Sequence, residues 1–203
     1  MQTATCLVRR IQVKLLLVAA FAVLCFMVPD ARVAAQPCGI ERWDVKTLTD
    51  SLVGRINFQD TINSSVRKQT RLHAIKPSRH NRRMNRVEMK FYRVKAWLIG
   101  MVLEKDRDYH LVLKDLTTDS TMVIEIPDPD CAEVAATPWA AQYREARNWI
   151  SDHIRKPTTK YKELPAPVQV VVHGVGFYDR LHGQHGMAWN GRELHPVMSI
   201  GSP

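Results

Sequence analysis

The segment VQVVVHGVGFYDRLHGQHGMAWNGRELHPVMSI occupies residues 168–200. It opens with a run of valines and aromatic residues, and its last seven residues are again mostly apolar. The pattern predicts two strands of one sheet, joined by a loop rich in glycine and histidine. Gly174 and Gly176 stand two apart in the first strand, so they share a face. There they would let the strand bend or let another backbone approach.

Three further strands are expected between residues 87 and 126. Apolar residues fall on odd positions from Val87 and on even positions from Val94, and this change of phase predicts a bulge near residues 92–94. One long strand would therefore cover residues 87–102, with Gly100 as a second weak point. Residues 109–115 and 121–126 follow as shorter strands separated by turns.

A single helix is expected after these strands, beginning at Thr137-Pro138 and ending before Pro157. Its apolar residues recur at spacings of three and four, which is typical of a helix with one buried face. They are Trp139, Tyr143, Ala146, Ile150 and Ile154. We expect this stripe to close one end of a barrel rather than to bind a ligand, and residues 158–167 to form a polar linker.

This order of three strands, one helix and two strands resembles the OB-fold, a five-stranded Greek-key barrel with a helix between its third and fourth strands. The resemblance covers residues 87–200 and implies a mainly β domain. The segments DYHLVLKD, VIEIPDPDC, HGVGFYDRLHGQHG and GRELHPV are also similar to parts of uncharacterised exported bacterial proteins. No activity is assigned to those proteins, so the similarity implies no catalytic residue.

Residues 1–35 have the pattern of a signal peptide. Arg9, Arg10 and Lys14 precede an apolar run over residues 15–28, which is shorter than the roughly 20 residues of a membrane span. Cleavage is expected after Ala35, giving a secreted or periplasmic protein with no stable membrane span. The alternative is an uncleaved N-terminal anchor.

Cleavage would remove two of the four cysteines and leave Cys38 and Cys131. One pair in an exported protein predicts a disulfide, because oxidising compartments preserve such bonds. Two free thiols or a metal-binding pair remain the alternatives.

Positive charge is concentrated in one stretch of the chain. The whole chain has a formal net charge of +9, and residues 67–86 hold eight Lys and Arg residues without an acidic one. We therefore divide the remaining chain into an N-terminal arm with a basic loop, residues 36–86, and the barrel domain, residues 87–203. The basic loop is expected to be exposed and to attract polyanions.

A binding role is favoured over catalysis, with nucleic acid or an anionic polysaccharide as ligand and an envelope protein as another possible partner. OB barrels hold polymers with stacking rings and basic side chains. The candidate ligand-binding residues are Arg93, Lys95, Trp97, Tyr109 and His110 in the strands, and Arg79, Arg82, Arg83 and Arg86 in the basic loop.

A metal-dependent hydrolase is the alternative, using His182, His185 and His195 with Asp179 or Glu193. Imidazole and carboxylate groups suit zinc and related divalent ions, and no other cofactor is expected. However, the spacing His-x-x-His in a glycine-rich loop lacks the helical geometry of known zinc hydrolases. Two other interpretations remain. His195 could bond the loop backbone while the other two histidines are exposed, or the protein could be a structural envelope component.

Overall fold

The computed structural model describes residues 38–203 except 79 and 81. The predicted signal peptide, its cleavage site and Arg79 lie outside these residues. Within the described chain, no helix is both long enough and apolar enough to cross a membrane.

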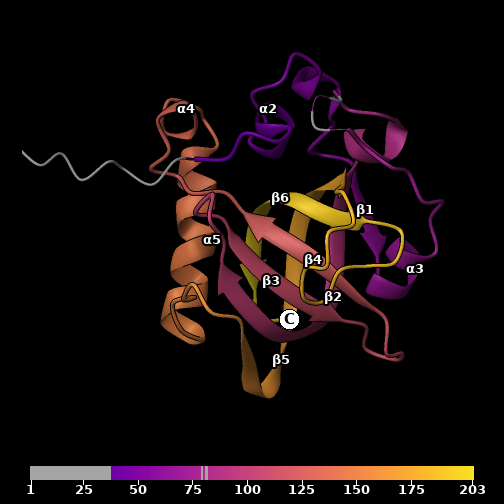
Figure 1. Cartoon of the computed structure of the whole chain (residues 1–203), viewed down its shortest axis with the longest axis vertical. Helices are drawn as coiled ribbons and strands as arrows, with labels where there is room; N and C mark the ends of the chain where they lie inside the picture. The colour runs from indigo at the N-terminus through magenta and orange to yellow at the C-terminus, as the bar shows by residue number, and fades with distance from the viewer. Residues whose placement is uncertain (1–37, 79, 81) are drawn as a thin grey trace, which may run out of the picture. The chain divides into compact units, whose positions relative to one another are not determined.

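The described chain is mainly β, with one six-stranded mixed sheet and short helices around it (Figure 1). The strands are β1 Thr61–Ser64, β2 Phe91–Leu103, β3 Tyr109–Lys114, β4 Thr121–Ile126, β5 Lys162–Tyr178 and β6 Arg192–Gly201. The α-helices are α2 Trp43–Lys46, α3 Val66–Thr70, α4 Ala132–Ala135 and α5 Ala140–His153. Two 3-10 turns, Val53–Arg55 and Arg86–Met89, complete the elements.

The strands follow the order β1-β2-β3-β4-β6-β5, and β5 also pairs with β2. Neighbouring strands are antiparallel except for the β1–β2 and β4–β6 pairs, which are parallel. The short β4–β6 pairing joins Val123 to Glu193 and Ile124 to Leu194. It places β4 between β3 and β6, and this arrangement brings polar side chains from three strands together.

The predicted bulge near residues 92–94 is wrong. β2 begins at Phe91, and its register shifts between Leu98 and Gly100 against both β3 and β5. The apolar phase changes at residue 91 because Val87 and Met89 belong to the preceding 3-10 turn and not to the strand. At Gly100 a Cβ atom would meet the Tyr161 ring, so this weak point of the strand lies where another segment crosses closely.

The predicted bend at Gly174 and Gly176 is confirmed. The pairing of β5 with β6 shifts register at both glycines. The Gly176 N–H donates to the Lys90 carbonyl at 3.1 Å, and a Cβ atom at Gly176 would meet the Val87 carbonyl oxygen. A second backbone therefore passes over the bent strand.

The long helix α5 presents the predicted apolar stripe to the sheet. Tyr143, Ala146 and Ile150 are buried, and the Thr137 hydroxyl accepts a hydrogen bond from the Trp139 N–H just before the helix. The Tyr143 hydroxyl donates to the Thr47 carbonyl of the N-terminal arm at 3.2 Å. The helix thus packs against both the sheet and the arm. The expectation of a single helix missed α2, α3 and α4, which are only four or five residues long.

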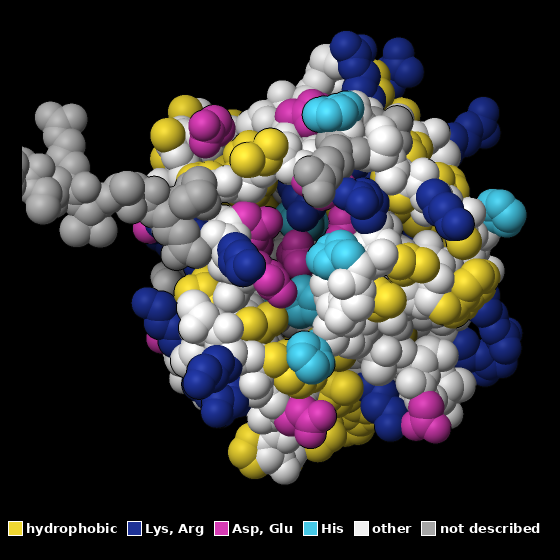
Figure 2. Space-filling model, viewed as in Figure 1, with side chains coloured by type: hydrophobic (Ala, Val, Ile, Leu, Met, Phe, Trp, Pro, Cys, Tyr) yellow, Lys and Arg dark blue, Asp and Glu magenta, His cyan; other side chains and the backbone are white. Residues whose placement is uncertain are grey.

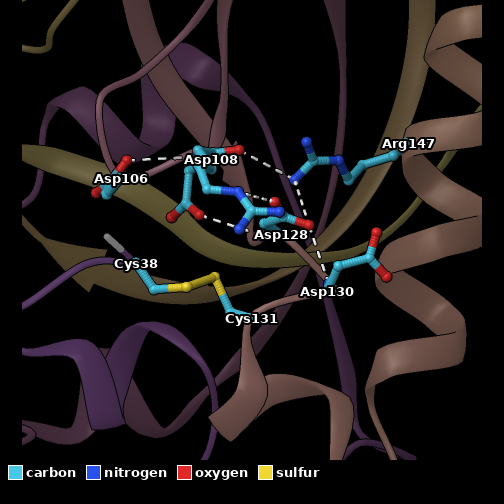
Figure 3. The surroundings of a disulfide bond; sticks show 8 residues. Cys38, Asp106, Asp108, Asp128, Asp130, Cys131 and Arg147 are labelled. Carbon is cyan, nitrogen blue, oxygen red and sulfur yellow. Dashed lines mark hydrogen bonds and ion pairs between the residues drawn. A yellow bond between two sulfur atoms is a disulfide. The ribbon is translucent and has the colours of Figure 1, made fainter. Parts of the chain in front are cut away.

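A disulfide between Cys38 and Cys131 confirms the predicted pairing and attaches the arm to the segment after β4. Figure 3 shows the bond beside aspartates of the β2–β3 loop and of the segment that follows β4. There the Asp128 N–H donates to Asp108 Oδ1 at 3.2 Å. The arm, the loop and this segment are therefore held against one another.

The basic loop is not exposed throughout, as Arg83 shows. Its side chain is fully buried, its guanidinium lies 2.7 Å from Asp50 Oδ2, and it donates to the Glu88 carbonyl. The prediction that Arg83 contacts a polyanion is wrong, because the arm supplies a carboxylate that pairs with it inside the protein. Arg82 and Arg86 are exposed, as expected.

Candidate active-site cleft

An open cleft of about 340 Å³ lies where the arm meets two loops of the sheet. Figure 2 shows acidic, histidine and basic side chains gathered around a hollow on this face. The lining residues are Cys38, Gly39, Ile40, Glu41 and Lys46 of the arm, Glu104, Lys105 and Asp106 of the β2–β3 loop, Glu125 of β4, and Asp179, His182 and Gln184 after β5.

Negative charge dominates the lining of this cleft, although the chain as a whole is basic. Five of the lining residues carry carboxyl groups, against the two lysines Lys46 and Lys105. Lys46 is largely buried, and its Nζ lies 3.8 Å from Glu125 Oε2. Burial alone would lower the pKa of Lys46, but the nearby carboxylates of Glu125 and Asp179 raise it above its ordinary value. The cleft therefore favours cationic or neutral ligands over anionic ones.

Glu125 forms the floor of the cleft and lies between two histidines. His110 stands opposite it on β3, and its Nδ1 is 2.9 Å from Glu125 Oε1. His195, on β6, has its Nδ1 2.9 Å from Glu125 Oε2. Burial would raise the pKa of Glu125, but Lys46 and the two imidazoles hold it well below its usual value. Glu125 is therefore a permanent carboxylate at neutral pH.

The surroundings of His110 determine its protonation state. Its Nε2 lies 3.0 Å from the His185 carbonyl oxygen, which can only accept a hydrogen bond. Its Nδ1 faces the ionised Glu125, so both ring nitrogens must carry protons. Burial lowers the pKa of His110, but the bonds to Glu125 and to the His185 carbonyl raise it overall. His110 is a buried cation beside a buried anion.

His195 lies between two buried carboxylates. Its Nε2 is 3.2 Å from Asp108 Oδ2, but neither ring nitrogen makes a well-directed hydrogen bond. Burial lowers the pKa of His195, whereas Asp108 and Glu125 raise it overall. Burial raises the pKa of Asp108 to about 6. Among the described residues, one group of three acidic, His or Cys side chains has potential metal-ligand atoms that all lie within 4.8 Å of one another. Its members are Asp108, Glu125 and His195.

Glu104 lies near the same His110 nitrogen as Glu125. Its Oε1 lies 3.6 Å from His110 Nδ1, and its side chain is 38 % exposed to the cleft. Burial and the charge of Glu125 raise the pKa of Glu104, against the opposing effect of His110. Two carboxyl groups next to one ring nitrogen therefore have pKa values shifted in opposite directions.

Two further buried acids are Glu193 and the lining residue Asp179. Burial and repulsion from Asp179 and Glu125 raise the pKa of Glu193 well above its usual value, which favours the protonated form of this group. Asp179 Oδ2 accepts a hydrogen bond from Gln184 at 2.8 Å and lies 3.3 Å from His182 Nε2. Asp179 thereby orders the loop that forms one side of the cleft.

The three histidines predicted to bind a metal occupy different surroundings. His195 is fully buried beside Asp108 and Glu125. The His182 side chain is 57 % exposed beside Asp179, and the His185 ring stacks on Tyr161 at 4.0 Å between ring centres. Of the predicted set, only His195 belongs to the compact group described above.

The predicted stacking rings are distributed differently from expectation. Tyr109 and His110 are buried, and the Arg147 guanidinium covers the Tyr109 ring at 3.7 Å, so neither ring is available to stack on a ligand. Both are buried because β3 is covered on both faces: Tyr109 packs in the core, and His110 lies on the opposite face beside Glu125. The side chains of Arg93, Lys95 and Trp97 share the β2 face opposite the core, as predicted, and Trp97 lines a separate hollow of about 470 Å³.

Sequence reasoning missed Lys46, Glu104 and Glu125. Glu125 carried a usable signal, since it is the only charged residue in the apolar strand 121–126. Lys46 and Glu104 carried none, because they lie in polar segments whose position depends on the tertiary fold. Searches of protein-family models, curated proteins and solved structures return no match for this chain. The functional argument therefore depends on the geometry of the cleft.

Proposed function

We propose that the sheet is a closed five-stranded barrel of the OB type. The pairings that support this run from β2 through β3, β4, β6 and β5 and return to β2, with β1 added outside. In this arrangement the cleft lies between the loop joining β2 to β3 and the loop joining β5 to β6. These are the loops with which OB barrels bind oligonucleotides and oligosaccharides.

We propose a neutral sugar unit of an oligosaccharide as the ligand of the cleft. The five carboxyl groups of the lining would repel the phosphate that every nucleotide carries. The same groups accept hydrogen bonds from sugar hydroxyls. A role outside the cell agrees with the disulfide, since such bonds persist in oxidising compartments.

The proposed reaction is hydrolysis of a glycosidic bond. The supporting observation is that Glu104 and Glu125 lie on one cleft, beside one His110 nitrogen, with pKa values shifted apart. Such a pair assigns an acid and a carboxylate. Glu104 would donate its proton to the oxygen of the leaving sugar, while Glu125 stabilises the positive charge that develops on the sugar ring. Glu104 would then accept a proton from the attacking water.

The test is release of reducing ends from a panel of oligosaccharides by residues 36–203. Glu104→Gln should abolish release without lowering the melting temperature, because the side chain is partly exposed and retains its shape. Glu145→Gln, an exposed change on α5, is the matched control. Activity should fall as pH rises through the raised pKa of Glu104, since the acid loses its proton. Equal activity of the Glu104→Gln variant and the wild type would refute the assignment.

A further inference from the structure

Trp189 is a large aromatic side chain that the fold leaves exposed. It lies on the β5–β6 loop with 66 % of its surface exposed, while its neighbours Ala188 and Asn190 are buried. The Asn190 amide donates to the carbonyls of Gln69 and Leu72 at 3.1 and 2.9 Å. The backbone on either side of Trp189 is therefore packed against the protein, and the indole itself is exposed at the surface.

Two hollows meet at the Trp189 ring. One, of about 580 Å³, is lined by Lys76, Arg180 and Leu181 among others, and the second, of about 280 Å³, by Arg67 and Arg71 with hydroxyl-bearing residues. The hydroxyl-bearing residues are Thr70, Thr118, Ser120 and Thr121. The larger hollow shares Asp179 with the acidic cleft, so it adjoins the cleft. We call Trp189 with Arg67, Arg71 and Lys76 the Trp189 platform.

The charge of the Trp189 platform is opposite to that of the cleft. The side chains of Arg67, Arg71 and Lys76 are exposed, and within the described chain none of them forms an ion pair. Unpaired guanidinium groups beside an exposed indole can bind a carboxylate or sulfate while the ring covers the apolar face of a sugar. A positive platform thus adjoins a negative cleft.

We propose that the Trp189 platform binds an anionic sugar of a glycan whose neutral neighbouring sugar occupies the cleft. This inference rests on the proposed function and narrows its substrate to a glycan in which anionic and neutral sugars alternate. The charges determine which sugar occupies which site, because the acidic cleft would exclude the anionic sugar and the platform would attract it. A nucleic acid fits less well, since its phosphates recur at every unit and would enter the cleft.

The test is calorimetric binding of a hyaluronan oligosaccharide, in which a carboxylated sugar alternates with a neutral one. Trp189→Ala should weaken binding about tenfold, as expected for losing a large aromatic contact, and Trp189→Phe should restore most of it. Arg67→Gln with Arg71→Gln should weaken binding about tenfold or more. The double variant should leave binding of carboxyl-reduced, neutral hyaluronan unchanged. Arg82→Gln with Arg86→Gln, equal in charge but outside both hollows, is the matched control.

The outcomes separate this inference from the proposed hydrolysis. Binding that depends on Trp189 without any cleavage would support the platform and refute the hydrolase. Cleavage that is unaffected by Trp189→Ala would support the hydrolase and overturn the platform. An equal loss in the Arg82 and Arg86 control would also overturn it, because attraction would then be diffuse. Tighter, Trp189-dependent binding of a single-stranded oligothymidylate would replace the glycan with nucleic acid.

Discussion

Several side chains in this protein carry charge although they are largely buried. Glu125 and His110 neutralise one another, and Lys46 and His195 complete the group around Glu125. Removing one member of such a group leaves a buried charge without a partner, at a cost of about 3–5 kcal/mol. The arrangement therefore maintains the ionised state of Glu125 and does not by itself increase stability.

Asp108 gives the cluster a measurable pH dependence. Its pKa is raised from 3.8 to about 6, so the native state keeps a proton that the unfolded chain has released. Stability from this group is complete below about pH 4 and is lost as pH rises through about 6, by up to roughly 3 kcal/mol. Asp108→Asn keeps the neutral shape and should flatten this loss. Urea unfolding of both proteins from pH 4 to 7 measures it, with Asp60→Asn as an exposed control. Parallel curves for the wild type and the Asp108→Asn variant would show that Asp108 is not the group responsible.

At this scale the sequence located part of the site. Asp179, Glu193 and His195 stood out as polar residues near glycines in an apolar segment, and His110 stood out in its strand. Their roles could not be assigned, because the spacing of histidines in the loop says nothing about which carboxylates approach from the β2–β3 loop and from β4. Contacts such as His195 with Asp108 join residues far apart in the chain, and only the strand order determines them.

At the scale of elements, periodicity predicted what is regular and failed where the chain is irregular. Residues 121–126 form β4 as expected, and α5 buries the predicted stripe. β1 and the short helices lack enough residues for a recognisable period. β5 begins at Lys162, within the predicted linker, because pairing with β2 overrides the local effect of Pro165 and Pro167.

The bend of β5 at Gly176 provides a prediction for this scale. Gly176→Ala should destabilise the protein by about 1–3 kcal/mol, because the new methyl would meet the Val87 carbonyl, which is backbone and cannot rotate away. Gly201→Ala, at the end of β6 with open space around it, should be neutral or slightly stabilising. Thermal unfolding of the two variants measures the difference. Equal melting temperatures would mean that the 3-10 turn carrying Val87 can move away from β5 at no cost.

At the scale of the whole molecule, a disulfide links the arm to the segment after β4. Cys38 and Cys131 are 93 residues apart, and in the chain-entropy model closing such a loop contributes up to about 4.6 kcal/mol. The double change Cys38→Ser and Cys131→Ser should lower the free energy of unfolding by up to that amount. Alkylation of unreduced residues 36–203 should add no label. Labelling of both cysteines, or an unchanged unfolding free energy in the double variant, would contradict this role.

The net positive charge of the chain does not describe the cleft. Within the basic loop, Arg83 pairs with Asp50 inside the protein, whereas Arg67, Arg71 and Lys76 line the Trp189 platform, and the open cleft is acidic. A net charge sums over surfaces that the fold separates, so it cannot predict the sign of the potential inside any one of them.

The position of the disulfide also bears on when the cleft forms. Residues 38–41 make one wall of the cleft, and that wall begins at the half-cystine itself. A reduced chain could pair its strands while residues 38–41 are not attached to the segment after β4. The ligand pocket would then be completed by oxidation, as the last step of maturation, and the cell that makes the protein would carry it without a finished pocket until the thiols meet an oxidant.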